Sequence, residues 1–218
     1  MASYYGVLAG PAFAASYSIC GIFAGVISDR VNRKIFIGIC CILWSICTLL
    51  SGFIDSFAGL FIFRFMLGMF ESAFNPCAYG IISDNFHPSS RTIANSLYNS
   101  AIYLGGALSS LAGIMITSLG WRGTFEIIGL IGIGSGIIGL IFIMEPKRGK
   151  FDVKKVETNA TPVKDLRTPV QKFLSAGSEI FVNPTCRYTA IAGSCRFFAG
   201  YGIGFFMPAY FGHNYKDQ

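Results

Sequence analysis

Six long apolar runs constrain this chain more than any other feature. They occupy about residues 4–28, 35–54, 58–83, 92–118, 123–144 and 186–211. Each is close to the ~20 residues of helix that cross the ~30 Å hydrocarbon core of a bilayer. Lipid cannot bond to backbone N–H and C=O groups, so runs of this kind cross a membrane as helices. We therefore predict an all-α membrane protein with six transmembrane helices.

The cations indicate how these helices are oriented. Thirteen of the 17 Lys and Arg residues fall in or beside the connections at 29–34, 84–91 and 145–187, whereas the opposite side holds two. Loops that stay in the cytoplasm are rich in Lys and Arg, so we place these three connections there. By the same count both ends of the chain lie on the far side, which suggests a further helix before residue 1.

The longest connection, 145–185, is polar and carries most of these cations. We interpret it as a cytoplasmic linker between two helical bundles. A short amphipathic helix is expected near 163–181.

Several other functions are excluded by the pattern of residues. The net charge of +6 comes from scattered cations and not from a basic face interleaved with aromatic residues, so we expect no nucleic-acid partner. The seven cysteines include no CxxC pair, which favours buried thiols over a metal site. The GxGxxG at 134–139 follows no strand and does not indicate a dinucleotide site. Without a nucleophile elbow or acid–base pair, we expect neither an enzyme nor a cofactor.

Small residues repeat along three of the runs and predict faces of close helix contact, because small side chains let helices approach in lipid. These residues are Ala14, Ser18, Gly21 and Gly25 in the first run, Ala101, Gly105, Ser109 and Gly113 in the fourth, and Gly132 and Gly136 in the fifth. We interpret them as packing surfaces and not as ligand sites.

The third run carries a polar stripe on an otherwise apolar helix. Arg64, Gly68, Glu71 and Asn75 are spaced by four, three and four residues, which puts them on one helix face. At 1.5 Å per residue, Glu71 lies roughly 20 Å from Asp84 at the cytoplasmic end, near the midplane. Charged groups at this depth face the protein interior or a watery cavity. The stripe is interpreted as a substrate or proton pathway, with a structural Arg–Glu pair as the alternative.

Two more residues extend this interpretation. Pro76 is expected to kink the third span and to leave one backbone carbonyl without its helical hydrogen bond. Transporter helices often contain such kinks, and other groups then bond to the carbonyl. Arg196 lies in the last run, roughly 15 Å from the cytoplasmic edge. It either lines the same pathway or extends its charged end to that edge.

A short charged segment, GVISDRVNRK at 25–34, separates the first two runs. It resembles the GxxxDRxxRK signature between the second and third helices of the major facilitator superfamily of transporters. The sequence is most similar to that of the Spinster-type branch, whose members carry three motifs in this order. They are DRxNRK, then R-x3-G-x2-E with an Asp thirteen residues after the Glu, then EPxRG. In this chain those motifs are Asp29 to Lys34, Arg64, Gly68, Glu71, Asp84, and Glu145 to Gly149.

The resemblance implies that the six spans are helices two to seven of a twelve-helix fold, an incomplete major facilitator superfamily fold. Residues 1–144 then hold five helices of the N-terminal half, 145–185 the central linker and 186–218 the first helix of the C-terminal half. The implied function is secondary active transport of a small organic or lipid-like solute, coupled to protons. The implied location, among membrane lipid, is the lysosomal or vacuolar membrane or the plasma membrane.

The resemblance also implies residue roles. Arg64 is expected to hold an anionic group and Glu71 to exchange a proton, with Asn75 and Arg196 in the same pathway. We expect Gly25 to allow close packing, and Asp29 to accept hydrogen bonds from a helix N-terminus or to pair with a cation such as Arg91. The residues expected to form a cytoplasmic gate are Gly25, Asp29, Arg30, Arg33, Lys34, Asp84 and Arg91.

Helix one and helices eight to twelve of the family have no counterpart in this sequence. In the family, helix one adds a protonatable acid to the cavity, and the signature Asp docks near helix eleven. Three alternatives stay open: the sequence is part of a longer transporter, a second chain supplies the missing helices, or the chain is a non-transporting structural membrane subunit.

The orientation is testable at the sequon Asn159-Ala-Thr in the linker. A cytoplasmic linker is never exposed to the glycosylation machinery, so Asn159 is predicted to stay unmodified when the protein is made in eukaryotic cells. A glycosidase-sensitive mass shift at Asn159 would overturn the predicted topology.

Overall fold

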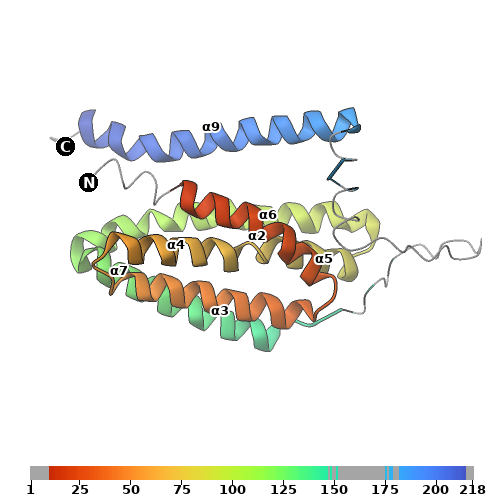
Figure 1. Ribbon diagram of the computed structural model, residues 1–218, viewed down its shortest axis with the longest axis horizontal. Helices are drawn as coiled ribbons and strands as arrows, with labels where there is room; N and C mark the ends of the chain where they lie inside the picture. Colours follow the sequence, from red (N-terminus) through yellow and green to blue (C-terminus); the bar gives the residue numbers. More distant parts are fainter. Residues whose placement is uncertain are drawn as a thin grey trace, which may run out of the picture. The chain divides into compact units, whose positions relative to one another are not determined.

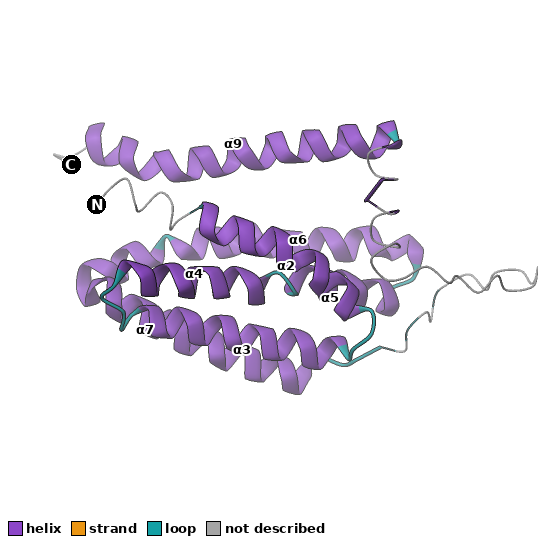
Figure 2. Ribbon diagram, viewed as in Figure 1, coloured by secondary structure: helices purple, strands orange, loops and turns teal. Residues whose placement is uncertain are grey.

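The structure is a computed structural model and describes residues 10–146, 148, 151, 175, 177, 178 and 182–214. These residues form helices joined by short turns, without a strand, which confirms the all-α class (Figures 1 and 2). They belong to two compact units, Met1–Lys154 and Lys155–Gln218. The helices described in the first unit are α2 (Pro11–Ser28), α3 (Arg33–Ser51), α4 (Phe57–Glu71), α5 (Phe74–Asn85), α6 (Pro88–Ser109) and α7 (Leu111–Phe142); α9 (Pro184–Asn214) is in the second.

The six predicted spans are all found as helices. The third span comprises α4 and α5, the fourth comprises α6 and the first residues of α7, and the fifth is the rest of α7. α7 is interrupted at Gly120, whose φ of 73° is accessible to glycine at little cost. Within the described residues, Arg33–Ser51, Phe57–Asn85 and Leu111–Phe142 are long and apolar enough to cross a membrane. The helix expected near 163–181 falls almost wholly outside those residues.

The predicted kink in the third span is confirmed as a break between α4 and α5. α4 ends at Glu71 and α5 begins at Phe74, with Ser72 and Ala73 in a turn between them. Proline has no N–H for the carbonyl four residues back, and its ring crowds that carbonyl. For Pro76 this is the carbonyl of Ser72. The break therefore places Glu71 at the end of a helix inside the membrane.

α3 and α7 lie side by side and antiparallel, in contact through glycines of α7 (Figure 1). A β-carbon added at Gly129 would lie 2.7 Å from the backbone of Leu49, and one at Gly136 would lie 2.7 Å from Cγ1 of Ile42. Gly132, between them, also packs against α3. The predicted contact face of the fifth span is confirmed.

α2 packs mainly through residues other than the predicted ones, although Gly21 of the predicted set does face a neighbour: a β-carbon there would lie 3.7 Å from Cβ of Ser72. A β-carbon at Gly68 of α4 would collide with the hydroxyl of Ser16, which is fully buried. By contrast, Ala14 and Ser18 are exposed, and a β-carbon at Gly25 would meet no described atom within 4 Å. The close packing expected at Gly25 has no partner among the described residues and stays a prediction. The buried residues of α2 are also small, so size alone did not distinguish the two faces.

The predicted stripe on α6 has no partner among the described residues. Ala101, Gly105, Ser109 and Gly113 are all exposed. A β-carbon at Gly105 or at Gly113 would meet nothing within 4 Å. No described helix makes the contact predicted for this face, which stays a prediction.

α7 contains glycines that pack against α3, such as Gly129, and glycines that face open space, such as Gly134. Substitutions at the two positions give a matched test of the packing. Gly129→Ala is expected to lower stability by about 1–3 kcal/mol, because the new methyl group has no room against α3. Gly134 faces open space, so Gly134→Ala is expected to be neutral or to stabilise the helix by up to ~1 kcal/mol. Melting temperatures of the two variants in the same detergent check this. Equal melting temperatures would contradict the tight α3–α7 contact.

Candidate functional site

Arg33 holds together two helix ends and a loop on the side predicted to be cytoplasmic. It is the first residue of α3, which the side chain of Asn32 caps by accepting from the backbone N–H of Ile35 at 3.0 Å. Arg33 Nη1 donates to Asp84 Oδ2 at 2.5 Å, and Nη2 donates to Asp29 Oδ1 at 3.2 Å. The side chains of Arg33 and Asp84 are 11% and 12% exposed, whereas that of Asp29 is 77% exposed. The shielded pair is therefore the one that ties α3 to α5.

The segment after α7 adds two residues to this region. Glu145 accepts a hydrogen bond from the backbone N–H of Lys34 at 2.8 Å. Arg148 donates to the backbone carbonyls of Asp29 and Val31 in the loop between α2 and α3. Asp29, Arg33, Asp84, Glu145 and Arg148 are called the cytoplasmic cluster below. Glu145 and Arg148 belong to the EPxRG motif but are not among the predicted gate residues. The motif was the feature of the sequence from which their place in the cluster could have been predicted.

Four more predicted gate residues are Asp29, Arg30, Lys34 and Arg91. Asp29 pairs with a cation, as one of the two alternatives expected, but the cation is Arg33 and not Arg91. Arg91 instead donates from Nε to the carbonyl of Phe86 at 3.2 Å. Arg30 is exposed, and Lys34 contributes its backbone N–H to the cluster.

The charged residues of the polar stripe are not paired with each other. Glu71 is half-buried at the end of α4. Arg64, two turns earlier, places its guanidinium 5.6 Å from the ring centre of Phe125 in α7. Among the described residues no ion pair joins Arg64 to Glu71, although the charge of Arg64 acts on that carboxyl group. The arrangement leaves a carboxylate and a guanidinium on one helix without the structural Arg–Glu pair that was the alternative interpretation.

Asn75 lies at the centre of a hydrogen-bonded network just after the helix break. Its Nδ2 donates to the hydroxyl of Tyr17 at 2.8 Å, and the hydroxyl of Tyr98 donates to its Oδ1 at 2.6 Å. Tyr98 also contacts the rings of Phe74 and Tyr79, at centroid distances of 6.4 and 5.3 Å. Asn75, Tyr17 and Tyr98 thus join α5 to α2 and α6. No motif in the sequence points to Tyr17, whose partner is 58 residues away.

α5 connects the stripe to the cytoplasmic cluster. Asn75 lies near its start and Asp84 near its end, about 14 Å apart at 1.5 Å per residue. The structure therefore brings Asn75 and Asp84 onto one short rigid helix, next to the turn that follows Glu71. Arg196 lies on the exposed surface of α9 in the other unit, and its role stays a prediction.

Comparison with known proteins gives matches over nearly the whole chain. A family model described as the Major Facilitator Superfamily matches residues 3–217. The Danio rerio protein named sphingosine-1-phosphate transporter SPNS2 is 28% identical over 204 residues, which cover 91% of this chain and 38% of that protein. The probable L-galactonate transporter of Escherichia coli (strain K12) is 32% identical over 123 residues, which cover 56% of this chain and 27% of that one.

A solved structure matches at the level of the fold. It is a crystal structure of a bacterial homolog to the human lysosomal transporter Spinster, in an inward-facing and unoccupied conformation. The match has a TM-score of 0.74 at 29% identity and covers 96% of this chain and 47% of that one. The chain thus spans less than half the length of these relatives. It is a multi-pass integral membrane protein that belongs to the major facilitator superfamily, as a Spinster-like member.

Proposed function

We propose that this chain forms part of a secondary active transporter for a small organic or lipid-like solute that carries an anionic group, with proton coupling. In this proposal, residues 1–144 supply five helices of one half, 145–185 the cytoplasmic linker and 186–218 the first helix of the other half. The observation that carries the proposal is that Glu71 and Arg64 lie on one membrane helix and that neither forms an ion pair with a described residue. Charges at this depth are costly unless they serve a pathway or a partner.

The names of the relatives fit an anionic solute. Sphingosine-1-phosphate carries a phosphate group and L-galactonate a carboxylate, according to the names of the two proteins compared above. A guanidinium matches both groups through paired hydrogen bonds. We assign that contact to Arg64, which packs on Phe125 and has no carboxylate partner among the described side chains.

Glu71 is assigned the proton. It lies where the helix breaks, so its surroundings change if α4 and α5 move relative to each other. Burial costs more free energy for a charged carboxylate than for a neutral carboxyl group, so proton binding changes how favourable a buried position is for Glu71. This couples the proton to the position of α5.

The cytoplasmic cluster is assigned to a gate. Secondary transporters of this type rock two halves around a central site, and a gate must hold in one state and release in the other. Within the described residues Arg33 Nε is buried next to Gly80 of α5 without an acceptor, so one donor of the cluster is unsatisfied. Arg148 and Glu145 hold the loop and the first residues of α3 beside it.

The first test concerns Glu71. The complete transporter that contains this chain, reconstituted in vesicles, is predicted to lose at least tenfold in proton-driven solute accumulation on Glu71→Gln, while downhill exchange of solute continues. Uptake of labelled solute, with and without an imposed pH gradient, measures this. Glu126→Gln removes another half-buried carboxylate. This variant is the matched control and should keep the response to the pH gradient. Gradient-driven accumulation that survives Glu71→Gln would remove Glu71 from the coupling role.

A second candidate is a non-transporting membrane subunit. Purification of the 218-residue chain at fixed stoichiometry with a larger membrane assembly would support this candidate. Purification as a longer chain with further membrane helices would exclude it.

A further inference from the structure

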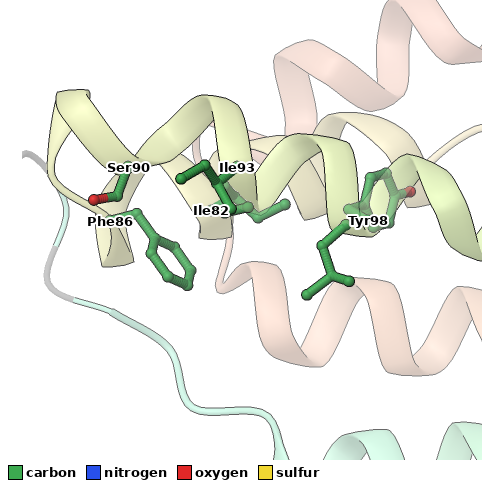
Figure 3. A pocket seen from close by; sticks show the side chains of 7 residues that line it. Ile82, Phe86, Ser90, Ile93 and Tyr98 are labelled. Atoms are coloured by element: carbon green, nitrogen blue, oxygen red, sulfur yellow. The ribbon is translucent and has the colours of Figure 1, made fainter.

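α5 turns two different faces to its neighbours. Cys77, Gly80 and Asp84 are spaced by three and four residues, which puts them on one face of the helix. Cys77 is fully buried and donates to the hydroxyl of Ser28 in α2 at 3.4 Å. On the other face, Ile82 lines an apolar groove together with residues of α6 (Figure 3). The face that carries Gly80 therefore lies against α2 and the start of α3.

The guanidinium of Arg33 lies directly against Gly80. A β-carbon added at Gly80 would lie 2.6 Å from Cζ of Arg33, 2.7 Å from Nε and 2.9 Å from Nη1. Non-bonded carbon atoms make their best contact at about 3.5–4.0 Å, so any side chain at this position would displace the guanidinium. Nη1 is also the nitrogen that donates to Asp84 Oδ2 at 2.5 Å. The shielded pair thus needs the space that a glycine leaves one helical turn before Asp84.

Arg33 has little freedom to move away from a larger residue at position 80. Its side chain is 11% exposed, and its two outer nitrogens bond to Asp84 and Asp29. A guanidinium is planar and rigid, so its three nitrogens move together. Nε is buried and has no acceptor among the described residues. The position of the guanidinium is therefore set by the two carboxylates on one side and by the contact with Gly80 on the other.

We propose that Gly80 is a positioning residue of the cytoplasmic cluster, which admits the Arg33 guanidinium to Asp84. A methyl group at position 80 moves the whole guanidinium away from α5 and breaks its bond to Asp84. The contact with Gly80 determines how closely the start of α3 and the end of α5 can approach. The role of the cluster as a gate rests on the proposed function, whereas the contact between Gly80 and Arg33 does not.

Melting temperatures of the purified protein in one detergent test the proposal. Gly80→Ala is expected to lower the melting temperature by roughly 2–8 °C, because the pair with Asp84 is lost. In a protein that carries Arg33→Ala and Asp84→Asn, the new methyl group meets no guanidinium. There Gly80→Ala is expected to have no effect or to raise the melting temperature, since alanine favours a helix more than glycine does.

Ile82→Ala is the matched control, because Ile82 lies on the other face of α5. It should lower the melting temperature by the same amount with and without the Arg33→Ala and Asp84→Asn changes. If Gly80→Ala also gave equal losses in the two proteins, Gly80 would pack against a group other than Arg33 and the proposal would be wrong.

Arg33→Lys gives a second test that retains the charge at position 33, and it serves where the neutral protein does not fold. The lysine ammonium is a compact charge on a flexible stem, so it can avoid a methyl group at position 80 and still reach Asp84. Arg33→Lys is therefore expected to lower the melting temperature of the unmodified protein and to raise that of the Gly80→Ala protein. A similar loss in both proteins would contradict the positioning role.

Solute exchange by the complete transporter in vesicles separates this inference from the proposed function. Gly80→Ala is expected to change the exchange rate about tenfold, the factor for one charge-assisted hydrogen bond. Asp84→Asn should change the rate in the same direction, and the two changes together should add little to either alone. Unchanged exchange in a Gly80→Ala protein that behaves as expected in the melting experiments would exclude the gate but not the contact between Gly80 and Arg33.

Discussion

The shielded ion pair between Arg33 and Asp84 is the interaction on which the rest of the described bundle depends. It joins the first residue of α3 to the last turn of α5, 51 residues further along the chain. The same guanidinium reaches Asp29 after α2, and the segment after α7 bonds to the loop between α2 and α3. Removal of one member leaves a buried charge without its partner, which costs about 3–5 kcal/mol in comparable pairs. Arg33 therefore joins the start of α3 to the end of α5 and to the residue after α2, and the segment after α7 bonds to the same loop.

The break at Ser72 and Ala73 relates the cytoplasmic cluster to the proposed function of Glu71. It divides one membrane span into α4, which carries Arg64 and Glu71, and α5, which is bonded at both ends. Asn75 fixes one end of α5 to α2 and α6, and Asp84 fixes the other to Arg33. In the proposed function, a change of charge at Glu71 therefore acts at the turn between α4 and α5, and α5 is bonded at both of its ends.

The sequence predicted the features that follow from local chemistry. Apolar length located the six spans, the missing N–H of Pro76 located the break, and the glycine spacing at 132 and 136 located the α3–α7 contact. Features that depend on which helix neighbours which were not predictable in this way. Gly25 and Ala14 belong to a small-residue pattern as regular as that of Gly132, yet α2 packs through its opposite face. Similarly, the partner of Asp29 is Arg33, four residues further along the chain, whereas Arg91 bonds to the carbonyl of Phe86.

The central claim, that the Arg33–Asp84 pair fastens the cytoplasmic ends, is tested most directly by a double-mutant cycle. Unfolding free energies in one detergent would be measured for the unmodified protein, Arg33→Gln, Asp84→Asn and the variant with both changes. The account predicts that each single change is destabilising and that the second adds little to the first, which gives a coupling of about 1–3 kcal/mol. Additive losses, with a coupling near zero, would contradict it.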